Sequence, residues 1–136
     1  MQSFDVRTPR RVTFVDITAQ VTAAVEGRGE GAVLVYVPHT TAGVTINEDV
    51  DPSVRNDLEM ALERLVPSDL PFTHAEGNSD AHTKASLMGS SVTVPLAAGR
   101  LQLGTWQGIY LCEFRTQAGP REVVVTAWGG SARVAE

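Results

Sequence analysis

The sequence has a single cysteine and no long apolar run, and both shortages restrict where the protein works. Cys112 has no partner for a disulfide within the chain, which is typical of a reducing compartment. No apolar run approaches the ~20 residues that a membrane-spanning helix needs. The opening residues, MQSFDVRTPRR, also lack the charged-then-apolar order of a secretory signal. We therefore expect a cytoplasmic protein without a membrane partner.

The chain also lacks an excess of basic residues. Eleven lysines and arginines face sixteen aspartates and glutamates, which gives a formal net charge of −5. Phosphate backbones attract basic surfaces, so nucleic acid is not expected as a main partner. A small basic pocket is compatible with an acidic protein, and a small phosphorylated molecule therefore stays possible as a ligand.

The length and composition predict one globular domain that covers residues 1–136. A chain of 136 residues is of ordinary single-domain size and too short for the usual (β/α)₈ barrel. Strand-like and helix-like segments are mixed, but they do not alternate as in a doubly wound sheet. We expect an α+β fold with a largely antiparallel or mixed β-sheet and two to three short helices.

Hydrophobic periodicity and turn residues predict the individual elements. The first helix is expected to begin at the capping residue Asp16 and to end at the glycines that follow Val25. The second is capped by Asp51 and stopped by Pro67, and the third begins near Ser79 or Asp80 and ends before Gly89. The expected strands are 3–6, 11–15, 32–37, 44–48, 91–95, 109–115 and 122–128.

All three histidines lie in two polar segments, which makes a metal site the leading hypothesis. His39 follows a predicted strand, whereas His74 and His82 are separated by eight residues across a glycine-containing loop. Neutral imidazole is a common ligand for transition metals, and three ligands leave a coordination position for water or substrate. The alternative is three hydrogen-bonded surface histidines. Glu76, Asn78 and Asp80 beside them favour the site, since such groups bind metals or orient imidazoles.

Two further groups of residues carry candidate chemistry. Glu48 closes an apolar strand and would act as a general base if it shared a pocket with His39. Trp106 either fills the core or offers an aromatic surface, and the glycines around it indicate a close backbone approach. Arg115, Arg121 and Lys84 would suit a phosphate or carboxylate group if they faced the same pocket.

With these residues laid out, the sequence resembles the YjbQ-like family, also described as the secondary thiamine-phosphate synthase family. The matching segments are PHTTAGVTINEDVDPSVRNDLE, HAEGNSDAHTKASLMGSS, LGTWQGIYLCEF and GPRE, within about residues 31–128. The resemblance implies a compact α+β fold that assembles as a homotrimer, with the histidine cluster near a subunit boundary. It also implies that His39, His74 and His82 bind a metal.

The family's name rests on joining a pyrimidine pyrophosphate to a thiazole phosphate, which is the activity that the resemblance implies here. We expect a divalent metal, together with Arg121, to neutralise the charge of the leaving group. The expected metal is zinc, and magnesium is the alternative if the substrate is a pyrophosphate. Glu48 or Asp80 would transfer protons. The expected substrate-binding residues are Asn47, Asn78, Lys84, Trp106, Gln107 and Arg115. The sequence between Phe114 and Gly119 departs from the family's commoner pattern. This departure puts the role of Arg115 in doubt more than that of Arg121.

Two other functions stay open from the sequence. Three-histidine zinc sites more often activate water than form C–N bonds, which favours a metal-dependent hydrolase of a small phosphorylated compound. A non-catalytic trimeric protein that binds a metal or a ligand would also carry these residues.

Overall fold

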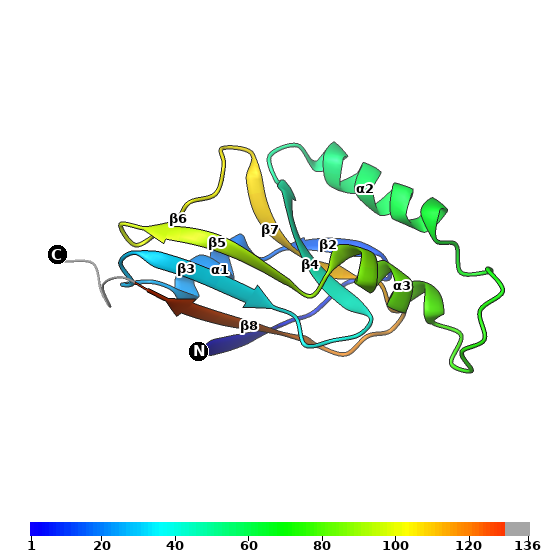
Figure 1. The fold of residues 1–136 in the computed structure, drawn as a ribbon. Coiled ribbons are helices and arrows are strands. Elements are labelled where there is room, and N and C mark those ends of the chain that lie inside the picture. Colours follow the sequence, from blue (N-terminus) through cyan, green and yellow to red (C-terminus); the bar gives the residue numbers. More distant parts are fainter. Residues whose placement is uncertain (130–136) are drawn as a thin grey trace.

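A computed structural model describes residues 1–129, which form two antiparallel β-sheets and three helices (Figure 1). The larger sheet has the strand order β1-β8-β3-β5-β6, and the smaller has the order β2-β7-β4. The α+β class with an antiparallel arrangement is therefore confirmed, while residues 130–136 of the expected domain lie outside the described range. The strands are β1 (Gln2–Val6), β2 (Thr13–Asp16), β3 (Gly31–Tyr36), β4 (Ala42–Glu48), β5 (Ser91–Ala97), β6 (Arg100–Leu101), β7 (Gln107–Glu113) and β8 (Arg121–Trp128).

The larger sheet buries one face because its strands alternate in polarity. On β3, Val33 and Val35 are buried, and their neighbours point outward. Val123 and Val125 of β8 are buried in the same way. Side chains in a strand alternate between faces, so these valines form one apolar layer directed at the smaller sheet.

Strand β7 is buried on both faces, which explains its uninterrupted apolar run. Ile109 and Leu111 pack into the core beneath the larger sheet. Tyr110 and Cys112 point the other way, into a second core with residues of α2 (Pro52–Leu65) and α3 (Ser79–Met88). The smaller sheet thus forms a middle layer, with the larger sheet on one side and the two helices on the other.

The helix boundaries follow from identifiable residues. Asp51 caps α2, as expected, by accepting a hydrogen bond from Ser53 N at 2.9 Å. The first helix, α1 (Thr18–Ala24), has Ile17 at its N-cap position, so the expected cap at Asp16 is wrong. The Asp16 side chain instead accepts from Thr18 N at 2.9 Å, in a turn that precedes the helix.

One strand boundary and one additional strand differ from expectation for backbone reasons. Strand β2 begins at Thr13 and not at Arg11, because Val12 has a positive φ of 46° that interrupts the extended chain. The short strand β6 was not expected. It pairs with β5 through a tight hairpin in which Ala98 and Gly99 have φ values of 52° and 74°. No helix among residues 1–129 is long and apolar enough to cross a membrane.

Candidate functional site

The connection between β3 and β4 brings His39 to one face of α3. His39 and His82 line the same hollow, which has a volume of about 510 Å³. On α3, His82 shares a face with Ala85 and Ser86, as their spacing of three and four residues requires. The full lining is His39, Thr40, Ala42, His82, Ala85, Ser86, Gly89 and Ser90. None of these residues is acidic.

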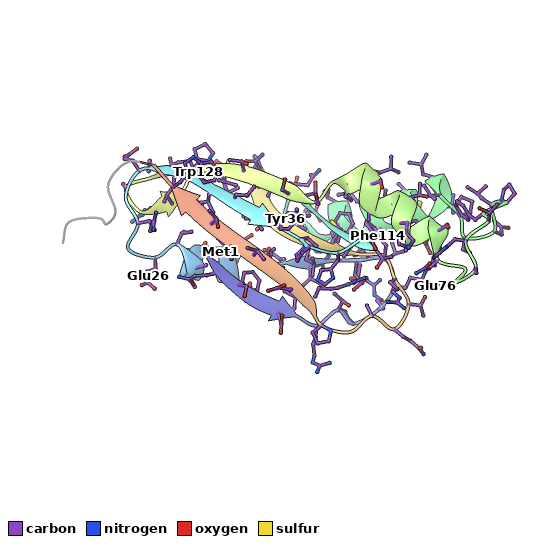
Figure 2. The ribbon with its side chains drawn as sticks, turned by 60° about the horizontal axis from the view of Figure 1, so that its bottom comes forward. Met1, Glu26, Tyr36, Glu76, Phe114 and Trp128 are labelled. Atoms are coloured by element: carbon purple, nitrogen blue, oxygen red, sulfur yellow. The ribbon has the colours of Figure 1, made fainter. Side chains whose placement is uncertain are left out.

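The third histidine joins the group through His82. The rings of His74 and His82 meet edge to face, with centroids 5.4 Å apart and an interplanar angle of 83°. His74 Nε2 lies 3.8 Å from Glu76 Oε1, and Arg115 Nη2 lies 3.9 Å from Glu76 Oε2. Figure 2 shows Glu76 on the loop at the far end of the molecule from Trp128. All three histidines therefore gather at the end that α3 covers.

His39 is half-buried, and its ring is held by the backbone of β8. Glu122 N donates a hydrogen bond to His39 Nε2 at 2.9 Å. Burial and the positive charge of Arg121 lower the pKa of His39 below its ordinary value. The imidazole is thus favoured in its neutral form.

A single chain does not complete the metal site that the sequence predicts. Among residues 1–129, no group of three or more histidines, cysteines and carboxylates lies where it would hold a metal ion. His74 and His82 are neighbours, but the Nε2 lone pair of His39 is already engaged by Glu122 N. The residues present therefore fit at most a partial ligand set.

Arg121 lies beside this site but does not reach into it. Its side chain is buried and makes a two-point pair with Glu113, with Nε to Oε1 at 2.7 Å and Nη2 to Oε2 at 2.6 Å. Nη2 also donates to Thr41 Oγ1 at 2.8 Å. Arg121 thereby fixes the loop that carries His39, and it is not among the residues that line the hollow.

Lys84 and Asp80 are likewise buried in an ion-pair network. The ammonium of Lys84 lies 2.6 Å from Glu63 Oε1 and 3.3 Å from Asp80 Oδ2, and Arg11 also pairs with both carboxylates. Burial alone would raise the pKa of Asp80, but hydrogen bonds and charge from Arg11 and Lys84 outweigh it and lower the pKa. Lys84 has no solvent exposure, so this network holds α3 against α2 and the chain before β2.

A second hollow, of about 430 Å³, is lined in part by the loop that precedes α3. Its lining includes Arg115, Glu76, Asn78 and Arg11. The Arg115 side chain is 48% exposed, and within residues 1–129 its one ion-pair contact is the long one to Glu76. Asn78 Oδ1 is buried and has no hydrogen-bond partner among the described residues. Of the expected anion-binding residues, Arg115 is therefore the one that is open to a ligand near the histidines.

The remaining expected residues lie at the opposite end of β4. Glu48 is paired with Gln107 in the smaller sheet, and Asn47 is paired with Gly108. Strand β4 rises ~3.3 Å per residue, so about 20 Å separates this end from the His39 loop (Figure 1). The structure does not bring Glu48 together with His39.

The tryptophan at this end does not fill the core, because Trp106 is 60% exposed. The close approach expected at the neighbouring glycines occurs within the chain. A Cβ on Gly108 would lie 2.3 Å from Asp49 Oδ2, so the missing side chain makes room for a carboxylate.

A family model matches residues 2–130, and its description is "UPF0047 protein YjbQ-like". The chain belongs to this family. It is 48% identical over 120 residues to the UPF0047 protein MJ1081 of Methanocaldococcus jannaschii, covering 87% of this chain and 85% of that protein. It is 44% identical over 124 residues to YugU of Bacillus subtilis, covering 89% and 92%.

Solved structures of YjbQ-like proteins share the fold. An uncharacterised protein of the family from Clostridium acetobutylicum has a TM-score of 0.90 and 44% identity, covering 94% of this chain and all of that one. A protein of unknown function from Sulfolobus solfataricus also has a TM-score of 0.90, with 30% identity, covering 95% and 96%. The fold of this chain is therefore shared by both of these solved structures.

The sequence reasoning missed Glu113, the residue that organises this end of the YjbQ-like fold. Its carboxylate accepts from Thr8 Oγ1 at 2.8 Å and from Phe114 N and Arg115 N at 3.0 Å, besides Arg121. A signal was available, because Glu113 is a charged residue that directly follows the apolar residues 109–112 of β7. A buried carboxylate needs a partner, and the nearby arginine was the obvious one.

Proposed function

We propose that the histidine end binds a small phosphorylated heterocyclic compound together with a divalent metal, and that it is a catalytic centre with thiamine-phosphate-synthase-type activity. One observation carries the proposal: the chain's three histidines, from two segments far apart in sequence, gather around His82. Convergent imidazoles at a hollow, one of them with a perturbed pKa, are typical of functional sites.

The proposed metal is zinc, because imidazole nitrogen suits zinc better than magnesium, which prefers oxygen ligands. His74 and His82 would supply ligands. Since one chain supplies only a partial set, the other positions would be taken by water, by the substrate or by a second copy in the expected homotrimer. A bound metal would neutralise charge on a phosphoryl or pyrophosphoryl group.

The anion-binding part of the proposal rests on Arg115 and no longer on Arg121 and Lys84. Arg115 is exposed beside Glu76 and His74, and a guanidinium binds two phosphoryl oxygens at once. Arg121 and Lys84 are satisfied by buried carboxylates, so a ligand would have to break those pairs. The proton-transfer role expected of Glu48 or Asp80 is not part of this proposal, because Glu48 is distant and Asp80 is paired with Arg11 and Lys84.

Hydrolysis is the second candidate, and the exposure of the site favours it. The side chains of His74 and Glu76 are 42% and 62% exposed, so water has free access. Group transfer to an acceptor other than water requires that water be kept from the reaction. In one chain, nothing among the described residues covers this loop.

The cytoplasmic location is also part of the proposal. Cys112 is free and buried, and burial raises the pKa of its thiol well above the ordinary range. A thiol in this state is protected from oxidation and metal binding. It therefore packs as a small apolar side chain and takes no part in the proposed chemistry.

The test begins with metal content, measured by mass spectrometry on the wild type and on a His74→Gln/His82→Gln variant. We expect near-stoichiometric zinc in the wild type and its loss in the variant. Glu48→Gln, at the other end of β4, is the matched control and should keep its metal. A wild type that stays empty after zinc loading would contradict the metal part.

The same preparations are then given a pyrimidine pyrophosphate with a thiazole phosphate. A joined product indicates transfer, whereas a free pyrimidine alcohol indicates hydrolysis. Loss of one charged contact costs about 1.5–3 kcal/mol, so Arg115→Gln should raise KM about 10- to 150-fold. An unchanged KM would show that Arg115 does not bind the substrate. If the histidine variant turned over substrate as fast as the wild type, the catalytic part of the proposal would be contradicted and only a binding function would remain.

A further inference from the structure

The hydrogen bond from Glu122 N to His39 Nε2 determines which ring nitrogen carries the proton. A neutral imidazole has one N–H donor and one acceptor nitrogen. Since Nε2 accepts at 2.9 Å, it has no proton, and the proton is on Nδ1. In this state His39 has no lone pair left for a metal, because one is engaged and the other nitrogen is protonated.

The backbone around His39 is held at several points, so this arrangement is fixed. Before it, Val37 N donates to Ser90 O at 2.8 Å, and after it Phe114 N donates to Thr41 O at 3.2 Å. Arg121 Nη2 adds a bond to Thr41 Oγ1 at 2.8 Å. Arg121 also opens β8 next to Glu122, so one buried side chain steadies both the histidine loop and the amide that the histidine accepts from.

The hollow in front of His39 offers donors and no acidic group. Thr40, Ser86 and Ser90 contribute hydroxyls, and the other lining residues are histidine, alanine and glycine. A site of hydroxyls and an imidazole N–H, free of carboxylates, suits a ligand whose oxygens only accept hydrogen bonds. Phosphoryl oxygens have this character.

We infer that His39 is a hydrogen-bond donor to a phosphoryl oxygen through Nδ1–H, not a metal ligand, and that Arg121 is the positioning residue that keeps it so. This inference rests on the proposed function for the ligand class and assigns His39 a different role from His74 and His82. The division follows the geometry, because the latter two rings contact each other and not the β8 backbone.

The first test is ¹⁵N NMR of the histidine rings in the metal-free wild type, at a pH where all three are neutral. An unprotonated ring nitrogen resonates far downfield of a protonated one. We expect His39 to show a protonated Nδ1 and an unprotonated Nε2. The opposite pattern at His39 would overturn the inference. Arg121→Met should convert the single pattern to a mixture of both tautomers, and an unchanged pattern would remove Arg121 as the positioning residue.

The second test uses inorganic pyrophosphate as the probe, with binding measured by calorimetry. His39→Asn keeps an N–H near the Nδ1 position, while His39→Leu removes it at similar volume. A lost bond to a charged group predicts about 10- to 100-fold weaker binding for His39→Leu and a smaller change for His39→Asn. Equal affinity of His39→Leu and the wild type would contradict the donor role.

Zinc titration separates this inference from the proposed function. If His39→Asn binds zinc as the wild type does, His39 is not a ligand. If zinc at one equivalent shifts the His39 nitrogens as ligation would, the inference fails and the three-histidine site stands. Absence of any zinc binding, with the Nδ1–H tautomer present, would contradict the metal part of the proposed function alone.

Discussion

Glu113 is a charged residue in the apolar strand β7, and its surroundings explain why it stays ionised there. Burial alone would raise its pKa, but hydrogen bonds from Arg121, from Arg115 N and from Thr8 outweigh burial and lower it. A buried pair of this kind is a weak source of net stability, yet loss of one partner leaves an unpaired charge. Its main effect is therefore to fix one arrangement of the chain around His39.

This pair predicts how stability depends on pH. The pKa of Glu113 is lower in the folded protein than its ordinary value of 4.5, so its contribution is complete above that pH and is lost as pH falls through the folded pKa. One proton taken up on unfolding gives a slope of up to about 1.4 kcal/mol per pH unit. The slope is measured by urea unfolding at a series of pH values from neutral to acidic.

The control is Glu113→Gln/Arg121→Met, which keeps an amide oxygen for the backbone N–H groups but carries no charge. Its free energy of unfolding should fall less steeply below pH 4.5, because Asp80 is then the remaining buried carboxylate whose pKa is lowered. Equal slopes for the two proteins would show that Glu113 does not titrate as argued. Arg121→Met alone should cost about 3–5 kcal/mol at neutral pH.

At the scale of the elements, α3 lies directly on β4, and a glycine allows the approach. A Cβ on Gly43 would lie 2.7 Å from Gly89 O and 3.0 Å from Met88 Cβ. These neighbours are the C-terminal end of α3 and the residue that follows it. The distance between the helix that carries His82 and the strand that follows His39 is thus set by a missing side chain.

Gly43→Ala should therefore destabilise the protein by about 1–3 kcal/mol, because the backbone oxygen of Gly89 must move. Thermal and urea unfolding measure the loss. Gly119→Ala is the matched control, since a Cβ there meets nothing within 4 Å and its φ needs no glycine. Equal effects of the two substitutions would contradict the argument. A tenfold or greater loss of pyrophosphate affinity in Gly43→Ala alone would link the helix position to the site.

The elements themselves were largely predictable from the sequence because their signals are local. Asp51, Pro52 and the apolar stripe of α2 define a helix without reference to the rest of the chain. Strand β6 was not predicted because a strand of two residues shows no hydrophobic periodicity. The start of β2 was predicted wrongly because it depends on the φ of Val12.

The candidate site was predictable only in part, since tertiary pairing decides it. His74 and His82 lie close in sequence, and their contact follows from the loop between them. The burial of Arg121 and Lys84 depends on Glu113 and Glu63, residues that spacing did not single out. The expectation that Glu48 shares a pocket with His39 was wrong. The His39 loop precedes β4 and Glu48 ends it, so the length of the strand separates the two residues.

On the scale of the whole molecule, the candidate residues form two separate groups. The histidines lie at the end covered by α3, whereas Asn47, Glu48, Trp106 and Gln107 lie at the other end of β4 (Figure 1). In the homotrimer that the family resemblance implies, a neighbouring copy would supply further ligands to the proposed metal. Among residues 1–129, the histidine end offers the neighbouring rings of His74 and His82, while His39 Nε2 is engaged by Glu122 N.

The trimer is tested by the molar mass in solution, measured by light scattering during size exclusion. We expect three times the mass of one chain, and a mass of one chain would contradict the assembly. If a neighbouring copy completes the metal set, zinc content should fall with dilution into the monomeric range. Zinc retained by monomers would mean that one chain and water suffice.

The antiparallel pairing of β1 with β8 has a practical consequence for assays. Gln2 pairs with Val125, while Val6 pairs with Arg121 next to the His39 contact. The start of β1 and the end of β8 therefore both lie away from the histidine end (Figure 2). Immobilising the protein on a sensor chip through residue 1 would leave the hollow facing the flow of analyte. A chip surface could then report pyrophosphate or zinc binding without blocking the site that it measures.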